Sequence, residues 1–591
     1  MQCHDARAEG LIFGQETSIG ETMQNVGFEM DGAFSRRNFL KGAAAGLAVG
    51  SAAVIAGCAP RTLSSGEDEP LANTASSNDL SSLGEMKPID SFDFVDTIDT
   101  EVLVVGAGNA GASAFLAAVE SGVDTLLIEQ GTDETRNMAK NNLMGFRTRA
   151  CERDGVNVDQ GAVIKELARY ASGRCDQELM KVWADNSAEA INRIEEVLEK
   201  RNCKFVIEKE ETEGLFIKEY LTSHMAVSND ESMNKIDHTG FTIEDAVELG
   251  GTYRTETKLV QLIKEEDRIA GVVAETPDGY VRINASNGVI LCTGGYSTNI
   301  EMMKIKNPLA LSTTARIDPV NTNGAGILSA LWVGAAMDEV PTVMVFDRGA
   351  LLPDELPGTE PFDRSWWWPG SQPFLRVNHN GERFAPESNP YDFVVHAASL
   401  QPKKCWIQVW DSSFWDNVAK FQTVGCSRLI QKEGAKAPVI WPRSVIEEDW
   451  ANLEKAGYII KAETLEEIAE AFDLPVDTFL ATVERYNELA EKGVDEDFYC
   501  ESFRMSTLKN PPYYAINLAS RLLCTLDGLR INEKMEVLDT ESRPIPGLYA
   551  AGNDSGGFFA NNYPELVVAV AAGRTVTFGR LAGKNAASNH S

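Results

Sequence analysis

Three glycines at a fixed spacing are the residues whose pattern most directly indicates chemistry. Gly106, Gly108 and Gly111 follow the apolar run 102–105 and open an alanine-rich segment with helical spacing, and a second apolar run then ends on Glu129. In a strand–helix–strand unit these glycines permit a tight turn, close approach of a pyrophosphate, and close packing of helix on strand. The helix N-terminus offers unpaired N–H groups to phosphates, and Glu129 is placed to accept hydrogen bonds from ribose hydroxyls. The stretch predicts a dinucleotide site.

Two further glycine-containing elements narrow the dinucleotide to FAD. Short alternating strands after Gly251 lead into the apolar run 288–292, which ends at Thr293-Gly294-Gly295. A second apolar run near the C-terminus ends at Gly552-Asn553-Asp554. Together with the first glycine turn, the strand-and-TGG element resembles the two-part adenine site of FAD proteins, which NAD-binding Rossmann domains lack, and the resemblance makes FAD the expected cofactor. A helix is expected to begin near Glu565, after Pro564, with the Val567 N–H among the amides that steady negative charge on the flavin.

The segment 136–145 lies where this class of domain wraps the flavin, and it adds two candidates to those above. The complete set of predicted cofactor-binding residues is Gly106, Gly108, Asn109, Ala110, Gly111, Glu129, Asn142, Gly145, Thr293, Gly294, Gly295, Gly552, Asn553, Asp554, Leu566 and Val567. Residues 157–201 alternate apolar and charged positions at helical spacing, and we expect them to be scaffold.

The overall composition limits the class of protein. At 591 residues the chain is too long for one ordinary core, so two domains with appendages are expected. The formal net charge of −34 argues against nucleic acid as a partner. Ten cysteines lack CxxC spacing, so the sequence predicts no metal site and no haem on this chain. Electrons would then come from a separate cytochrome or quinol-linked protein.

The first sixty residues resemble targeting sequence. Arg36-Arg37 precedes a weakly hydrophobic run of small residues, 42–57, and Cys58 follows. This pattern resembles a Tat export signal with a lipobox, which predicts a signal over 1–57, lipidation at Cys58 and a flexible tether over 58–96. A transmembrane helix is the less favoured alternative because the run is short. The expected location is the outer face of the cytoplasmic membrane, with the lipid as the only membrane contact.

The motifs GAGNAG, CTGG, NTNGAG, NGERFAPE, GLYAAGND and TFGRLAG together resemble the FAD-dependent oxidoreductase 2 family, which includes soluble fumarate reductase, urocanate reductase and the 3-ketosteroid dehydrogenases. The resemblance implies an α/β fold. It consists of a Rossmann-like FAD-binding domain (GR2-type) in two chain segments, 97–345 and 523–588, and an inserted α+β capping domain, 346–522. The active site would lie at their interface.

The active-site positions depart from the fumarate reductase pattern and match the ketosteroid dehydrogenase branch. Tyrosines stand at two arginine positions of the fumarate pattern, and the site lacks the guanidinium and imidazole groups that two buried carboxylates need. The resemblance makes Tyr391 the proton donor at carbon, and Tyr563 with the Val567 N–H the clamp on the carbonyl oxygen. A neutral tyrosine hydroxyl suits an apolar substrate. Other aligned or aromatic positions are expected at the substrate: Phe346, Trp367, Trp368 and Cys524.

These residues predict an exported FAD-dependent oxidoreductase of the CH–CH type. It would reduce a carbon–carbon double bond conjugated to a carbonyl in an apolar, steroid-like or aromatic substrate. Three alternatives remain open: a 3-ketosteroid dehydrogenase running oxidatively, a fumarate reductase-like respiratory enzyme for another small acceptor, and a non-catalytic flavoprotein that carries electrons or binds a ligand.

Overall fold

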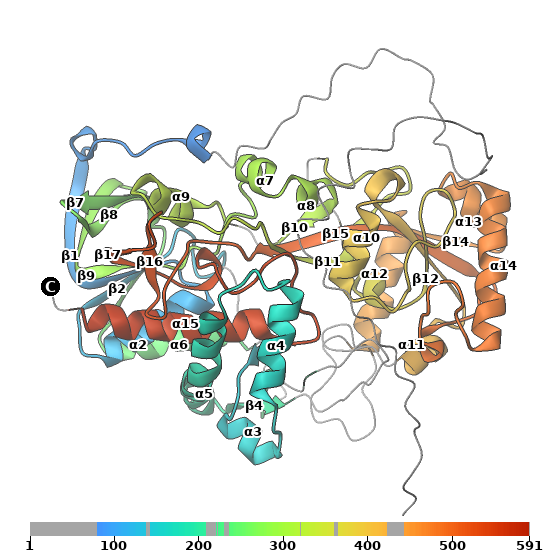
Figure 1. Ribbon diagram of the computed structural model, residues 1–591, viewed down its shortest axis with the longest axis horizontal. Coiled ribbons are helices and arrows are strands. Elements are labelled where there is room, and N and C mark those ends of the chain that lie inside the picture. Colours follow the sequence, from blue (N-terminus) through green and yellow to red (C-terminus); the bar gives the residue numbers. More distant parts are fainter. Residues whose placement is uncertain are drawn as a thin grey trace, which may run out of the picture. The chain divides into compact units, whose positions relative to one another are not determined.

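The computed structural model describes residues 80–136, 142–207, 220, 223–229, 236–318, 321–359, 365–421, 429 and 442–589 (Figure 1). The predicted signal over 1–57, with Cys58 and the first part of the predicted tether, lies outside these residues. Within the described part of the chain, no helix combines the length and apolar character that a bilayer crossing requires.

An eight-stranded sheet forms the half that is predicted to bind FAD, and its central strands are parallel. The order is β16-β17-β9-β1-β2-β6, and β8 and β7 continue from β9. Residues 102–105 of β1 are almost fully buried, which explains their unbroken apolar run. The α/β fold class is thereby confirmed. The bounds are β1 (Phe94–Val105), β2 (Thr125–Ile128), β6 (Thr252–Arg254), β7 (Lys258–Glu265), β8 (Arg268–Thr276), β9 (Gly279–Leu291), β16 (Glu536–Leu538) and β17 (Pro544–Ala550).

Helices and a small sheet complete this half. Helix α2 (Asn109–Glu120) packs along α15 (Val570–Ala587), so two helices from near the two ends of the described chain lie side by side (Figure 1). The region 157–201 forms the expected helices. The other elements are α3 (Arg149–Asp154), α4 (Gln160–Tyr170), α5 (Gln177–Glu199), α6 (His238–Glu248), α7 (Ile300–Lys306), α8 (Pro308–Ser312) and α9 (Ala325–Trp332), with a three-stranded sheet of β3 (Asn142–Met144), β5 (Ser223–Ser228) and β4 (Cys203–Ile207).

A six-stranded sheet built around β15 (Tyr513–Thr525) organises the rest of the chain. It contains β10 (Thr314–Ile317), β11 (Val343–Leu351), β12 (Leu375–Val377), β13 (Trp406–Asp411) and β14 (Ile459–Ala462). Its helices are α10 (Tyr391–Ala398), α11 (Phe414–Phe421), α12 (Arg443–Lys455), α13 (Leu465–Ala471) and α14 (Val476–Lys492). The predicted limits of the cap, 346 and 522, fall inside β11 and β15. They are therefore not breaks between elements, because β11 and β15 pair with each other within this one sheet.

The predicted tether is too long at its C-terminal end. Residues 80–83 and 89–91 form short 3-10 helices, and β1 begins at Phe94. The backbone of Lys87 exchanges two hydrogen bonds of 2.9 Å with the side-chain amide of Gln261 in β7. The polar composition of this stretch predicted a flexible tether, because contacts made by the backbone of Lys87 do not depend on the type of side chain.

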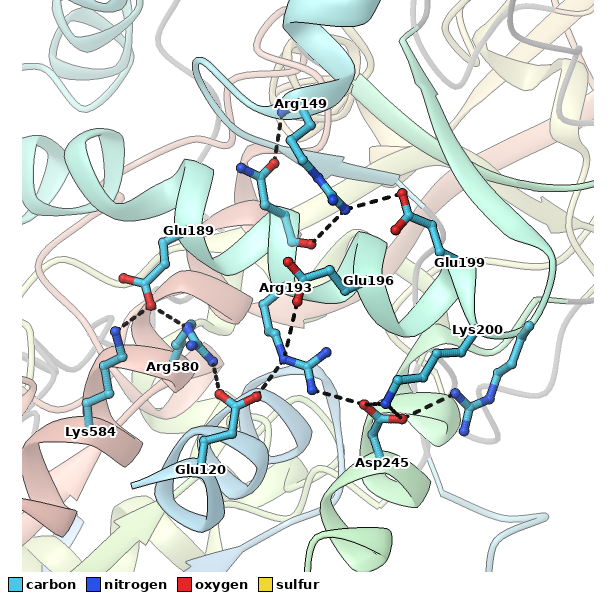
Figure 2. A network of polar contacts seen from close by, with 12 residues as sticks. Glu120, Arg149, Glu189, Arg193, Glu196, Glu199, Lys200, Asp245, Arg580 and Lys584 are labelled. Carbon is cyan, nitrogen blue, oxygen red and sulfur yellow. Dashed lines mark hydrogen bonds and ion pairs between the residues drawn. The ribbon is translucent and has the colours of Figure 1, made fainter. Parts of the chain in front are cut away.

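Ion pairs join the four helices beside the large sheet. Glu120 of α2 accepts from Arg193 of α5 and from Arg580 of α15 (Figure 2). Arg193 and Lys200 also reach the Asp245 carboxylate of α6, at 2.9 and 2.7 Å. Burial acts to raise the pKa of Asp245, but the hydrogen bonds from Lys200 and Arg193 outweigh it and hold that pKa below its usual range. The network therefore favours ionised Asp245 in the folded protein.

We expect Asp245→Ala to lower the free energy of unfolding by about 2–3 kcal/mol at pH 7, because it removes a buried carboxylate from several cations. The loss is expected to be full above the unfolded-state pKa near 4 and to shrink as pH falls from there through the depressed folded-state pKa, below which Asp245 is protonated in both states. Urea unfolding at pH 7 and pH 3.5 measures both effects. The control is Glu244→Ala, an exposed partner of Arg201, which should change stability by less than about 0.5 kcal/mol. Equal losses in the two variants would contradict this role for Asp245.

Candidate active site

A cavity of about 790 Å³ begins at the glycine turn after β1 and extends to the sheet around β15. Such a volume is ordinary for a cofactor and ligand site. The structure brings fifteen of the predicted residues to this one cavity: Gly106, Gly108, Asn109, Ala110, Glu129, Asn142, Thr293, Gly294, Phe346, Trp368, Tyr391, Cys524, Gly552, Asn553 and Tyr563.

The glycine turn has the geometry that pyrophosphate binding requires. Gly106 has φ +101°, and a Cβ there would lie 2.4 Å from the Cys292 carbonyl oxygen. A Cβ on Gly111 would lie 1.7 Å from the Gly106 carbonyl oxygen. By contrast, a Cβ on Gly108 would meet no atom within 4 Å, because that position faces the open cavity. Two glycines thus permit close packing and the third leaves room for a ligand.

Carboxylates fix the two loops that flank this turn. Glu129 lines the cavity, and its two oxygens accept from the N–H groups of Ala107 and Gly131 at 2.8 and 2.9 Å. Asp554 is fully buried and accepts from the Thr293 hydroxyl and the Gly295 N–H, each at 2.8 Å. Glu129 is therefore presented to the ligand, whereas Asp554 holds the TGG loop from behind.

Several predicted cofactor residues do not line the cavity. Gly111 packs against the glycine turn, Gly145 faces Ile191 of α5, and a Cβ on Gly295 would lie 2.3 Å from the Thr525 hydroxyl. With Asp554, these residues shape the site without facing it. Spacing alone did not separate glycines that face a ligand from glycines that permit close packing.

The prediction for Leu566 and Val567 is wrong in its local structure. Helix α15 begins at Val570 rather than near Glu565, and turns occupy the residues before it. The Val567 N–H donates to the Pro564 carbonyl oxygen at 3.0 Å, and Leu566 and Val567 are buried away from the cavity. The first turn of α15 instead lines the cavity through Ala571 and Ala572. Amide groups at a helix N-terminus are thus available, but from later residues.

Both predicted catalytic tyrosines line the cavity. Tyr391 is the first residue of α10 and is 3% exposed, and its ring meets the Phe346 ring edge-on at 4.3 Å between centroids. Tyr563 is 5% exposed and packs against Phe559. The two hydroxyl-bearing side chains come from positions 172 residues apart and meet the same space as the FAD motif.

The prediction for Trp367 is also wrong. Its side chain is fully buried, stacked on Trp410 at 5.7 Å and edge-on to Trp450 at 5.9 Å. Trp366 and Trp368 line the cavity instead, with 5.2 Å between their ring centroids. In an extended segment alternate side chains face opposite ways, so the middle tryptophan enters the core and the outer two form the wall.

Two charged groups of the cavity were not among the predicted site residues. Arg521 of β15 lines it, so the expectation of a site without guanidinium groups is wrong. Glu565 also lines it and accepts from the Tyr391 N–H at 2.8 Å. Burial, with Asp347 nearby, raises the pKa of Glu565 to about 8 despite that hydrogen bond. The position of Glu565 directly after Tyr563-Pro564 could have indicated that it belongs to the site. No comparable feature of the sequence pointed to Arg521.

Burial also raises the pKa of the neighbouring Asp392, and Glu565 adds to the effect. Two carboxyl groups therefore lie near each other behind Tyr391, in surroundings that favour their protonated forms. Burial therefore works against negative charge at this end of the cavity.

The residues present fit FAD. The turn at 106–111 leaves space for a pyrophosphate, Glu129 is placed for ribose hydroxyls, and the start of α15 offers amides to the polar edge of an isoalloxazine. Among the described residues, no group of three or more His, Cys, Asp or Glu side chains could hold a metal ion. Fold and site together define an FAD-dependent oxidoreductase.

Comparisons with known proteins agree with the assignment to FAD-dependent oxidoreductases. The family model of the FAD binding domain matches residues 101–565, and the chain belongs to this family. It is 27% identical over 495 residues to vinyl phenol reductase of Lactiplantibacillus plantarum, covering 82% of this chain and 96% of that protein. It is 30% identical over 380 residues to 3-oxosteroid 1-dehydrogenase of Mycolicibacterium smegmatis, covering 58% of this chain and 60% of that protein. The expected family and cofactor are therefore confirmed.

A solved structure supports the fold. The 3-ketosteroid Δ1-dehydrogenase of Sterolibacterium denitrificans, in complex with 1,4-androstadiene-3,17-dione, superimposes with a TM-score of 0.64 at 17% identity. The match covers 83% of this chain and 99% of that one.

Proposed function

We propose that this protein reduces a carbon–carbon double bond conjugated to a carbonyl or an aromatic ring. The observation that carries the proposal is the meeting of Tyr391 and Tyr563 in the cavity that also contains the glycine turn for FAD. Bound FAD, once reduced, would supply the hydride. The chain itself must hold the olefin, donate a proton and stabilise charge on the activating group.

Tyr391 is the proposed proton donor to carbon. A tyrosine hydroxyl is protonated at neutral pH and donates without bringing a charge into an apolar cavity. Its backbone is held by Glu565, and its ring is held by Phe346. These contacts restrict the tyrosine to one position against the substrate, which proton transfer in a transition state requires.

Tyr563 is the proposed hydrogen-bond donor to the activating oxygen of the substrate. It comes from the turn before α15, while Tyr391 comes from α10, so the two hydroxyls can act on different atoms of one substrate. Charge that develops on oxygen during hydride addition is stabilised by a donor already in place. The predicted role of the Val567 N–H is replaced by the first turn of α15.

Relatives support chemistry at carbon–carbon bonds. One relative is named as a reductase of a vinyl phenol, in which the double bond is conjugated to the ring. A second candidate function is the reverse reaction, because another relative is named as a 3-oxosteroid 1-dehydrogenase. The same two tyrosines would serve desaturation. Anaerobic reaction of the reduced flavin with olefins, and of the oxidised flavin with saturated ketosteroids, separates these directions.

We expect the rate of olefin reduction to fall as pH rises through about 8. Glu565 has a pKa of about 8, so its carboxyl group is mostly protonated at pH 7 and ionises above this value. A carboxylate at the cavity wall would oppose negative charge developing on the substrate oxygen. Profiles of kcat/KM between pH 6 and pH 10 should show this limb in the wild type and lack it in Glu565→Gln.

Glu501→Gln is the control for this profile, since Glu501 is buried but does not line the cavity. This variant should keep the wild-type profile. A limb near pH 8 that persists in Glu565→Gln would show that another group titrates.

We further propose that the protein is exported and lipid-anchored at Cys58, and that it receives electrons from a separate cytochrome or quinol-linked protein. The twin arginine and the Cys58 sequence motivate the first part. Mass spectrometry of the membrane-associated protein tests it: a diacylglyceryl-modified Cys58 at the N-terminus supports the proposal, and an unprocessed cytosolic chain contradicts it.

A further inference from the structure

One end of the cavity carries a positive charge. Arg521 is the only basic side chain among the described residues that line it. Of the two acidic lining residues, Glu129 is hydrogen-bonded beside the glycine turn, and Glu565 is mostly protonated at neutral pH. The chain as a whole carries a net charge of −34. A cation on the cavity wall therefore runs against the general charge of the protein.

The partners of Arg521 leave part of its guanidinium group open. Its Nε donates to Asp318, and within the described chain neither Nη group has a hydrogen-bond acceptor. Asp318 is shared with Arg316, whose Nε lies 3.2 Å from the other carboxylate oxygen. Asp318 is thus shared by two guanidinium groups and engages only the Nε of Arg521. Burial, with Arg316 and Arg348 nearby, lowers the pKa of Arg521, yet an arginine stays charged at neutral pH.

Flat apolar side chains surround this charge. The Arg521 guanidinium lies over the Trp366 ring, 4.4 Å from its centroid, and Trp368 lies beyond. Arg521 stands directly opposite Phe346 in the antiparallel pairing of β15 with β11. Phe346 in turn touches Tyr391. One aromatic side chain therefore separates the arginine from the proposed proton donor.

We propose that Arg521 binds a carboxylate of the substrate while Trp366 and Phe346 bind its flat conjugated part, so that the physiological substrate is a carboxylate-bearing aromatic olefin. The inference rests on the proposed function, which places the double bond beside Tyr391. A guanidinium group binds a carboxylate through paired donors, and the open Nη groups of Arg521 suit this role. The site would select one carboxylate rather than two, because Tyr391 and Tyr563 bring no positive charge for a second carboxylate.

Binding to the oxidised holoenzyme tests this subsite without turnover. The probes are two matched pairs, trans-cinnamate with cinnamamide and 4-vinylbenzoate with 4-vinylbenzamide, titrated while the flavin absorbance is followed. We expect at least one carboxylate to bind the wild type about tenfold to hundredfold more tightly than its amide, as a charge-assisted hydrogen bond implies. Arg521→Met should abolish this preference and change the affinity for the amide by less than about threefold.

Two further variants guard against a trivial loss of structure. Arg521→Lys keeps the charge and should keep part of the preference. Arg316→Met removes the other partner of Asp318 at a position that does not itself line the cavity, and should keep all of the preference. Flavin content and thermal midpoint show whether each variant is folded.

The proposal is overturned if the wild type binds no carboxylate more tightly than its amide, or if Arg521→Met weakens both members of a pair equally. Its failure is distinct from failure of the proposed function. Carboxylates that bind through Arg521 but never reoxidise the reduced flavin would contradict the reductase and leave the subsite intact. If amides are reduced at the same rate as their acids, by both the wild type and Arg521→Met, the carboxylate subsite is contradicted and the reductase function stands.

Discussion

Tyr391→Phe is expected to lower the rate of olefin reduction by about 10²- to 10⁴-fold, the usual contribution of a general acid. The substitution removes one hydroxyl and leaves the ring that packs against Phe346. Its backbone bond to Glu565 also remains. Flavin content, flavin spectrum and thermal midpoint should therefore stay close to the wild type. Single-turnover reoxidation of the reduced enzyme measures the chemical step.

The control is Tyr514→Phe, because Tyr514 is half-buried in the aromatic cluster with Trp410 and Trp450 and does not line the cavity. This variant should react at the wild-type rate. Slow proton transfer also predicts a solvent deuterium effect on the wild-type step. A Tyr391→Phe enzyme that reacts as fast as the wild type would remove Tyr391 from the reaction and favour a donor such as Glu565.

Gly111→Ala is expected to abolish the FAD-loaded protein. The added Cβ would lie 1.7 Å from the Gly106 carbonyl oxygen, which belongs to the backbone of the glycine turn. Since neither the helix nor the strand can move away freely, we expect a loss of at least about 3 kcal/mol in folding free energy, together with distortion of the phosphate site. The flavin-to-protein ratio and the thermal midpoint measure both effects.

Two other alanine substitutions separate packing from cofactor contact. Gly161→Ala adds a Cβ whose nearest neighbour is 3.4 Å away, so stability and flavin content should not change. Gly108→Ala meets no protein atom within 4 Å, so the protein should fold but bind FAD about tenfold to hundredfold more weakly. Full flavin content in Gly111→Ala would contradict the close packing of this turn.

The FAD-binding half was predictable because its signals are local. The buried run 102–105, the glycine turn and Glu129 lie within one continuous stretch, where spacing specifies strand, turn and helix directly. The resemblance added the two-segment FAD domain and the tyrosines. The exact limits of the cap were less predictable, because residues 346 and 522 lie inside β11 and β15 and the sequence has no break there.

The contents of the cavity were predicted less completely for two physical reasons. Trp366 and Trp368 face the cavity while Trp367 faces the core, which depends on the phase of an extended segment and not on residue type. Arg521 and Glu565 are positioned by partners far away in the chain: Arg521 donates to Asp318, and Glu565 accepts from the Tyr391 N–H. A single sequence does not show such long-range pairings.

The most direct test of the central claim is anaerobic stopped-flow mixing of the dithionite-reduced holoenzyme with conjugated olefins. The panel should contain enones, cinnamates, vinyl phenols and unsaturated steroids, and flavin absorbance reports each reaction. We predict that at least one conjugated aromatic olefin reoxidises the flavin and yields the saturated product, with the α-carbon hydrogen derived from solvent. If none of these olefins reoxidises the reduced flavin, while saturated ketosteroids bleach the oxidised flavin, the reductase assignment is contradicted.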